Sequence, residues 1–174
     1  MGIFGGYRAD RLIAEVRESG DPTSARAKSA LTKLQGLGQN AIQPIVDALA
    51  TADKRETIAF VETLTPLIDN KSFPVIARAL AEENPRAVAG VAWALASSRN
   101  YSPPKLLELL SEPGVSKPAV LDVIAAQKNR FQLRDLLNAA YQQDPFARRL
   151  KKTVGSTTTW YLWGGDLTYI WTLE

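Results

Sequence analysis

The chain has 174 residues, of which 45% are hydrophobic and 22% charged, values typical of a soluble globular protein with a sizeable core. It contains no cysteine and no histidine, which excludes disulfides, thiol nucleophiles, ordinary zinc sites and imidazole acid–base catalysis. The formal net charge is +3, but four basic residues lie together in "FARRLKK" at 146–152, so the rest is close to neutral. This distribution disfavours a nucleic-acid-binding protein, which usually carries a domain-wide basic surplus.

The N-terminal region predicts a leading helix over 7–19, in the segment "YRADRLIAEVRES". Leu12, Ile13 and Val16 are expected to turn toward the first of the following helices and to cap them, while the charged outer face meets water. Arginines and carboxylates interrupt this region, so it does not resemble a signal peptide. No run of 18 apolar residues suits a membrane span, and a cytoplasmic protein with no membrane partner is expected.

A period of thirty residues organises the chain after this helix. "PIVDALA" begins at Pro44, "PVIARALA" at Pro74 and "PKLLELL" at Pro104, and "RDLLNAA" follows at the next step, from Arg134. Two apolar columns run through these segments: Val46, Ile76, Leu106 and Leu136, and then Leu49, Ala79, Leu109 and Ala139. The spacing of three between columns indicates one face of a helix.

The segments between them repeat in the same register. Their columns are Leu31, Val61, Val91 and Leu121, and then Leu34, Leu64, Ala94 and Ile124. Asn40, Asn70 and Asn100 recur at the turns, where asparagine tolerates tight backbone geometry. Each unit is therefore predicted to be a helix pair, A then B, in repeats near 23–53, 54–83, 84–113 and 114–144. The columns are interpreted as core, because stacked pairs bury their apolar faces against each other.

The stretch "DPTSARAKSALTKLQGLGQNAIQPIVDALATAD" at 21–53 resembles the HEAT repeat family, specifically the short units also found in phycobilisome lyases. The Asp-Pro start, the small and aliphatic A helix, the glycine-containing turn and the proline-led B helix carry the resemblance. Later units have lost the turn glycines. The resemblance implies an all-α fold, an α-α superhelix over 1–152, in which the B helices line a concave surface that usually binds proteins.

That implication selects the B-helix positions off the core columns as candidate protein-binding residues. They are Arg78, Glu82, Lys105, Glu108, Glu112, Asp135, Asn138 and Gln142. Their mixed charge suits a protein surface better than a phosphate backbone, although a row of charges often does no more than face water. The sequence predicts a protein–protein interaction scaffold with no catalytic residues, no cofactor and no metal site.

Two alternatives from the same family stay open. Some HEAT-like proteins are alkylpurine DNA glycosylases, which would need a basic groove lined by aromatic residues. Trp93 lies one step before the core position Ala94, so it is expected to pack between repeats rather than to face a nucleobase. A phycobilin lyase-like chaperone is the other alternative, but no motif for handling a chromophore is present.

The repeat pattern fails after Asp144, where Lys151 falls on an apolar column. A short basic helix is expected over 145–152, followed at 155–174 by a β-hairpin in which "TTTWYLW" and "DLTYIWT" flank Gly164-Gly165. Its aromatic residues are expected to cap the stack or to mediate self-association into a homo-oligomer: Trp160, Tyr161, Trp163, Tyr169 and Trp171. Pairs "GS" at 155–156 and "LE" at 173–174 are typical of cloning sites, so a native tail and a tail that is appended or truncated are equally expected.

Overall fold

The computed structural model describes residues 3–132, 151–154, 157–164 and 167–173, with side-chain burial described over 6–132. The chain divides into two units, Met1–Lys128 and Asn129–Glu174, and each is treated by itself. The sequence analysis placed the boundary between the repeats and the tail further along the chain, after residue 152.

Residues 3–132 are helical, with no strand among them, which confirms the all-α class for this part of the chain. The α-helices are α1 (Ile3–Glu18), α2 (Ala25–Gln35), α3 (Ile42–Leu49), α4 (Lys54–Leu64), α5 (Phe73–Ala79), α6 (Pro85–Ser97), α7 (Pro104–Leu109) and α8 (Lys117–Ala126). The 3-10 turns η1 (Gly38–Ala41) and η2 (Thr65–Leu67) join α2 to α3 and α4 to α5, and a third, η3 (Lys128–Arg130), follows α8. The leading helix thus begins four residues earlier than expected, at residue 3 rather than 7.

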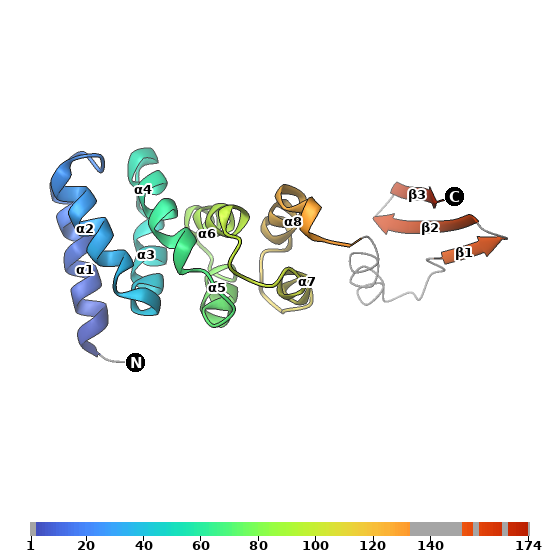
Figure 1. Cartoon of the computed structure of the whole chain (residues 1–174), viewed down its shortest axis with the longest axis horizontal. Coiled ribbons are helices and arrows are strands. Elements are labelled where there is room, and N and C mark those ends of the chain that lie inside the picture. Colours follow the sequence, from blue (N-terminus) through green and yellow to red (C-terminus); the bar gives the residue numbers. More distant parts are fainter. Residues whose placement is uncertain (1–2, 133–150, 155–156, 165–166, 174) are drawn as a thin grey trace. The chain divides into compact units, whose positions relative to one another are not determined.

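These helices pack in two layers, and Figure 1 shows them following one another in pairs along the first unit. In one layer, which we call the A layer, α2 contacts α4, α4 contacts α6, and α6 contacts α8. In the other, α1 contacts α3 and α3 contacts α5, while α7 packs on α8. Leu12, Ile13 and Val16 of α1 are buried, as expected for a helix that covers the first pair.

The core follows the apolar columns of the sequence. Val46, Ile76 and Leu106 are fully buried, and each has about 1.5 to 3 kcal/mol of burial free energy to contribute. Leu136 of the same column lies outside the described residues. In the A-helix column Val61 and Val91 are buried, but Leu31 is half-buried and Leu121 is 53% exposed. Leu121 lies on α8, the last α-helix among the residues that the structure describes.

Side-chain caps fix where three A-layer helices begin. Ser24 accepts a hydrogen bond from the Ala27 amide at the start of α2, and Asp53 accepts one from the Glu56 amide at the start of α4. Asn84 accepts from the amides of Arg86 and Ala87 at the start of α6, with Pro85 as its first residue. Such caps satisfy amides that have no partner within the helix.

The second unit contains an antiparallel sheet in the order β1-β2-β3, formed by β1 (Lys151–Val154), β2 (Thr157–Gly164) and β3 (Leu167–Leu173). Two expectations are wrong here. Lys151 and Lys152 pair with Trp160 and Thr159 in β1 rather than ending a basic helix. Residues 145–150 of that expected helix lie outside the described residues.

The second correction concerns the turn between the aromatic strands. Gly164 was expected to be a turn residue, but it is the last residue of β2 and pairs with Leu167. The strand is therefore one residue longer than the sequence predicted. Pairing gives each added residue backbone hydrogen bonds, which favours extending a strand into a glycine.

Candidate functional site

The structure describes five of the eight residues that the sequence predicted to bind proteins. Arg78 lies in the last turn of α5, and Lys105 and Glu108 lie on α7. Glu82 follows α5 and Glu112 follows α7. Asp135, Asn138 and Gln142 lie outside the described residues.

Two of these five residues make side-chain hydrogen bonds within the chain. The Lys105 Nζ donates to the backbone oxygen of Asn70 at 3.3 Å and lies 5.7 Å from the ring centre of Phe73. Glu82 accepts a hydrogen bond from Gln43 at 3.2 Å. No hydrogen bond or ion pair joins any two of the five described residues. They form a spread of separate polar positions rather than one assembled site.

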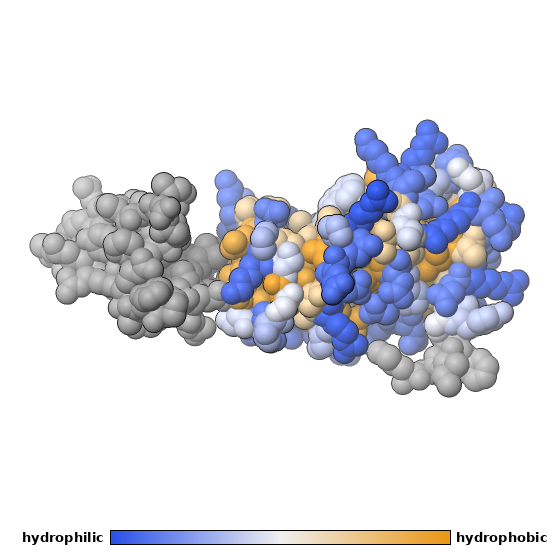
Figure 2. All heavy atoms as spheres, turned by 180° about the vertical axis from the view of Figure 1, so that it is seen from behind, coloured by the Kyte–Doolittle hydropathy of each residue, from blue (hydrophilic) through white to orange (hydrophobic). Residues whose placement is uncertain are grey.

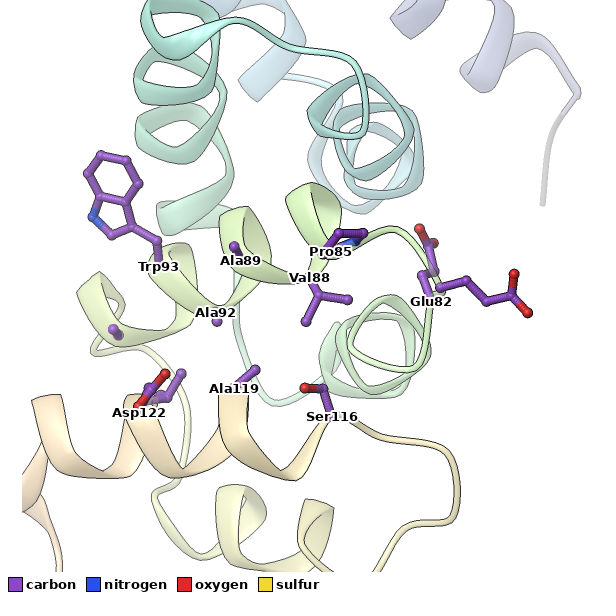
Figure 3. A pocket seen from close by; sticks show the side chains of 12 residues that line it. Glu82, Pro85, Val88, Ala89, Ala92, Trp93, Ser116, Ala119 and Asp122 are labelled. Carbon is purple, nitrogen blue, oxygen red and sulfur yellow. The ribbon is translucent and has the colours of Figure 1, made fainter.

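Two open grooves lie in the A layer. A groove of about 540 Å³ runs between α6 and α8, and we call it the α6–α8 groove (Figure 3). Its floor is made of small and aliphatic side chains, among them Val88, Ala92 and Ala119. Because alanines on both helices take little room, the two helices pack while leaving this space open.

A second groove, of about 610 Å³, lies between α4 and α6, and we call it the α4–α6 groove. Ile58, Gly90 and Trp93 contribute its apolar lining, and Lys54 and Arg86 bring positive charge. Trp93 and Ala89 line both grooves, so Trp93 stands on the ridge between them.

Trp93 is 49% exposed, so the expectation that it packs between repeats is wrong. Arg86, Ala89, Trp93 and Ser97 are all exposed and recur at helical spacing, which makes one outward stripe of α6. The opposite face of α6 is buried and contains Val91, Ala94 and Leu95. Figure 3 shows the indole ring standing clear of Ala119 and Asp122 of α8.

Exposed large hydrophobic residues gather on the A layer. Over 6–132, Ile58 of α4, Trp93 of α6 and Leu121 of α8 are exposed, together with Tyr7 of α1. The helices α3, α5 and α7 carry none in this range. Figure 2 shows hydrophobic residues reaching the surface between charged ones on one face of the first unit. The sequence predicts binding on the other layer, and the outward stripe of α6 is the signal in the sequence that could have indicated the A layer.

The α6–α8 groove is negative. Glu82 and Glu83 lie before α6 and Asp122 lies on α8, and Figure 3 shows Glu82 and Asp122 toward opposite ends of the groove. No Lys or Arg lines it, and none of the three carboxylates forms an ion pair with a described residue. The α4–α6 groove differs, since Lys54 and Arg86 outnumber Asp53 there.

The two carboxyl groups with a lowered pKa lie outside both grooves. A hydrogen bond from the Ser72 amide, assisted by the Lys71 amide, lowers the pKa of Asp69. Hydrogen bonds from the amide and hydroxyl of Thr23 lower the pKa of Asp21 in the same way. Both residues stabilise turns, and neither lines the two grooves. Among the described residues no group of three acidic side chains is placed to hold a metal ion.

Comparison with protein-family profiles, with curated protein sequences and with solved structures found no match for this chain. Within the described residues, no helix combines the length and the apolar character needed to cross a membrane.

Proposed function

We propose that this chain is a non-catalytic, HEAT-like helical repeat protein that binds another protein through its A layer, at Trp93 and the grooves beside it. The observation that carries the proposal is the half-exposed indole on a ridge between two open grooves. Tryptophan is enriched among residues that dominate binding energy, and hot-spot side chains gain most when a partner buries them. The resemblance of 21–53 to HEAT repeats supports a scaffold role.

The B-helix surface of the sequence prediction is the competing location. Its described residues carry charge but no exposed large hydrophobic side chain. Exposed charges add little affinity by themselves because water and salt screen them. The A layer therefore has the stronger support.

The A layer also offers little support to a DNA-binding or glycosylase-like role. One of the two grooves beside Trp93, the α6–α8 groove, has only acidic residues among its charged lining residues. These charges repel the phosphates of DNA. A phycobilin lyase-like role has no chromophore-handling residues to support it. Binding of a protein fits the mixture of apolar and charged lining best.

An aromatic photo-crosslinking residue at position 93, which keeps a ring on the ridge, tests the proposal, with position 108 on α7 as the matched probe of the B surface. Incubated in an extract of the cells that produce the protein, the probe at position 93 should give a discrete protein adduct. Excess unlabelled wild type should compete this adduct away, and excess Trp93→Ala should not. Adducts that form at position 108 and are competed equally by Trp93→Ala would move the site to the B surface.

A fold control accompanies this experiment. Trp93→Ala removes a half-exposed side chain, so its unfolding free energy should stay within about 1 kcal/mol of wild type. Leu95→Ala, two residues along on the buried face of α6, should cost about 2 to 5 kcal/mol. The pair separates a lost binding surface from a lost fold.

The tail sheet supports a second role, self-association. In the described sheet β3 is an edge strand with no partner on its outer side, and an open edge pairs readily with another chain. Trp160, Tyr161 and Trp163 lie on β2, and Tyr169 and Trp171 lie on β3, with Trp160 opposite Trp171 in the register. We propose that a second copy of this chain pairs at that edge.

A further inference from the structure

The α6–α8 groove combines two properties. Its floor is apolar, with Val88, Ala92 and Ala119, and its charged lining residues all have the same sign. An apolar floor favours aliphatic side chains of a partner. The charges decide which side chains can lie next to them.

Glu82, Glu83 and Asp122 give the groove three negative charges with no Lys or Arg lining it. Ion pairs with described residues do not neutralise them, and the hydrogen bond from Gln43 to Glu82 leaves that carboxylate charged. Such a surface repels phosphate-bearing nucleic acids and acidic proteins, and it attracts cationic segments over several ångströms. Trp93 at the edge of the groove adds an aromatic face that favours Arg or Lys.

The positions of the carboxylates also determine how far apart two cations of a partner should lie. Ser116 at the start of α8 and Pro85 at the start of α6 line the groove beside Glu82, and Asp122 follows Ser116 by six residues. At 1.5 Å per residue, Asp122 lies about 9 Å from Ser116 along α8, and Figure 3 shows Glu82 beyond Ser116, on the side away from Asp122. Two side chains at i and i+7 of a helix lie about 10.5 Å apart and so match the two ends.

We propose that the α6–α8 groove binds an amphipathic helical segment of a partner protein, with Lys or Arg at two positions seven residues apart and aliphatic residues between them. The cations lie against Glu82 and Glu83 at one end and Asp122 at the other, and the aliphatic residues cover Ala92 and Ala119. This inference rests on the proposed protein-binding function and names the chemical class of its partner.

A synthetic helical peptide with Arg at positions i and i+7 and Leu at i+3 and i+4 is the probe, and a peptide with Glu in place of both Arg residues is its control. The full-length, ¹⁵N-labelled chain has four tryptophans, so Trp93→Phe identifies the Trp93 indole signal by its loss. The Arg peptide should shift this signal in a saturable way. The Glu peptide should not shift it at the same concentration.

Charge variants locate the binding. Glu82→Gln combined with Glu83→Gln and Asp122→Asn should weaken binding of the Arg peptide about tenfold, since each exposed pair contributes modestly and three are removed. The matched control, Glu62→Gln combined with Glu18→Gln and Asp10→Asn, changes the net charge equally on exposed positions outside the groove. It should change the affinity less than about twofold, the residual effect expected of screened surface charge.

Equal loss of affinity in both triple variants would overturn the proposal, because the attraction would then be a net-charge effect. Equal binding of the Arg and Glu peptides would overturn it as well. If position 93 crosslinks to a protein while the Arg peptide fails to bind, the groove has been assigned the wrong partner chemistry, and the protein-binding function stands. If the adduct at position 93 is absent and the Arg peptide binds as expected, the groove proposal stands on its own measurement.

Discussion

At the scale of single residues, the amide of Gln127 stabilises the end of α6. Gln127 is 2% exposed, and its Nε2 lies 2.7 Å from the Leu95 oxygen, 2.8 Å from the Ala96 oxygen and 2.9 Å from the Ser98 oxygen. Its Oε1 accepts a hydrogen bond from the Tyr101 hydroxyl at 3.0 Å. The last carbonyls of a helix have no partner within it, so a buried side chain here does the work that water does at an exposed end.

Gln127→Met should therefore destabilise the fold by about 2 to 4 kcal/mol, because it leaves several buried polar groups without this partner at about 1 to 3 kcal/mol each. Tyr101→Phe removes one hydroxyl from the same cluster and should cost about 1 kcal/mol. Urea unfolding followed by circular dichroism measures both. A Gln127→Met variant as stable as Tyr101→Phe would show that the cluster contributes little.

The turn before α5 depends on a carboxylate. The Asp69 side chain accepts hydrogen bonds from the amides of Ser72 at 2.7 Å and Lys71 at 2.8 Å, and these bonds lower its pKa below the ordinary value of 3.8. A carboxyl with a lower pKa in the folded chain stabilises the fold at neutral pH. The contribution is lost as the pH falls from 3.8 through the lower pKa of the folded chain.

Asp69→Asn should accordingly be less stable than wild type at pH 7, and the difference should shrink as the pH falls below 3.8. Thermal unfolding at a series of pH values gives the difference directly. Glu62→Gln, on an exposed side chain, controls for the loss of one surface charge. A difference between Asp69→Asn and wild type that stays constant across the acid range would contradict the prediction.

At the scale of secondary-structure elements, the contact between α3 and α6 depends on a glycine. A Cβ on Gly90 would lie 2.9 Å from both Cδ atoms of Leu49, closer than real Cβ contacts come. Leu49 is 1% exposed, so its side chain has little room to withdraw. The absence of a side chain on α6 thus allows the two layers to approach each other at this point.

Gly90→Ala should destabilise the fold by about 1 to 3 kcal/mol through overpacking, against the gain of about 1 kcal/mol that Ala brings to a helix. Gly6→Ala on α1 is the matched control, because a Cβ there meets nothing within 4 Å. That variant should be as stable as wild type or more stable. Adding Leu49→Ala to Gly90→Ala should cost less than Leu49→Ala alone, and additive losses would contradict the contact.

The helices also show what the sequence could predict. Val46, Ile76 and Leu106 were recognisable as core because a period repeated three times leaves little doubt about the phase of a helix. Trp93 occurs at one position only, and a step of one residue turns a side chain by 100°, so its neighbour Ala94 gave no reliable guide. The grooves depend on which side chains of two helices fail to fill the space between them. That property belongs to the packed pair and has no pattern in either helix.

At the scale of the whole molecule, the tail unit was predictable in composition but not in detail. The β-branched and aromatic runs at 157–163 and 166–172 indicated two strands close to the observed β2 and β3, whereas β1 is four residues of "KKTV" with two lysines. So short a segment carries no alternation to read. Its pairing with β2 supplies the hydrogen bonds that make it a strand.

The self-association proposed for this sheet predicts a concentration-dependent mass. In sedimentation velocity the full chain should move toward a dimer as its concentration rises, and a version ending at Asp144 should remain a monomer. Ile170→Pro in the full chain removes a backbone amide from β3 and should also give a monomer, which guards against misfolding of the shortened chain. Equal masses for all three proteins at high concentration would contradict the proposal.

The position of α6 has a consequence for how the helices come apart. It packs against α3, α4, α5 and α8, whereas the main contacts of α8 among the described α-helices are with α6 and α7. In local unfolding, α8 should therefore separate from the rest of the helices before α6 does. A ligand that contacts both helices would raise the free energy of that local opening, and a more tightly bound ligand would raise it more. The ligand-bound and ligand-free proteins would then differ in their resistance to local unfolding while keeping the same structure.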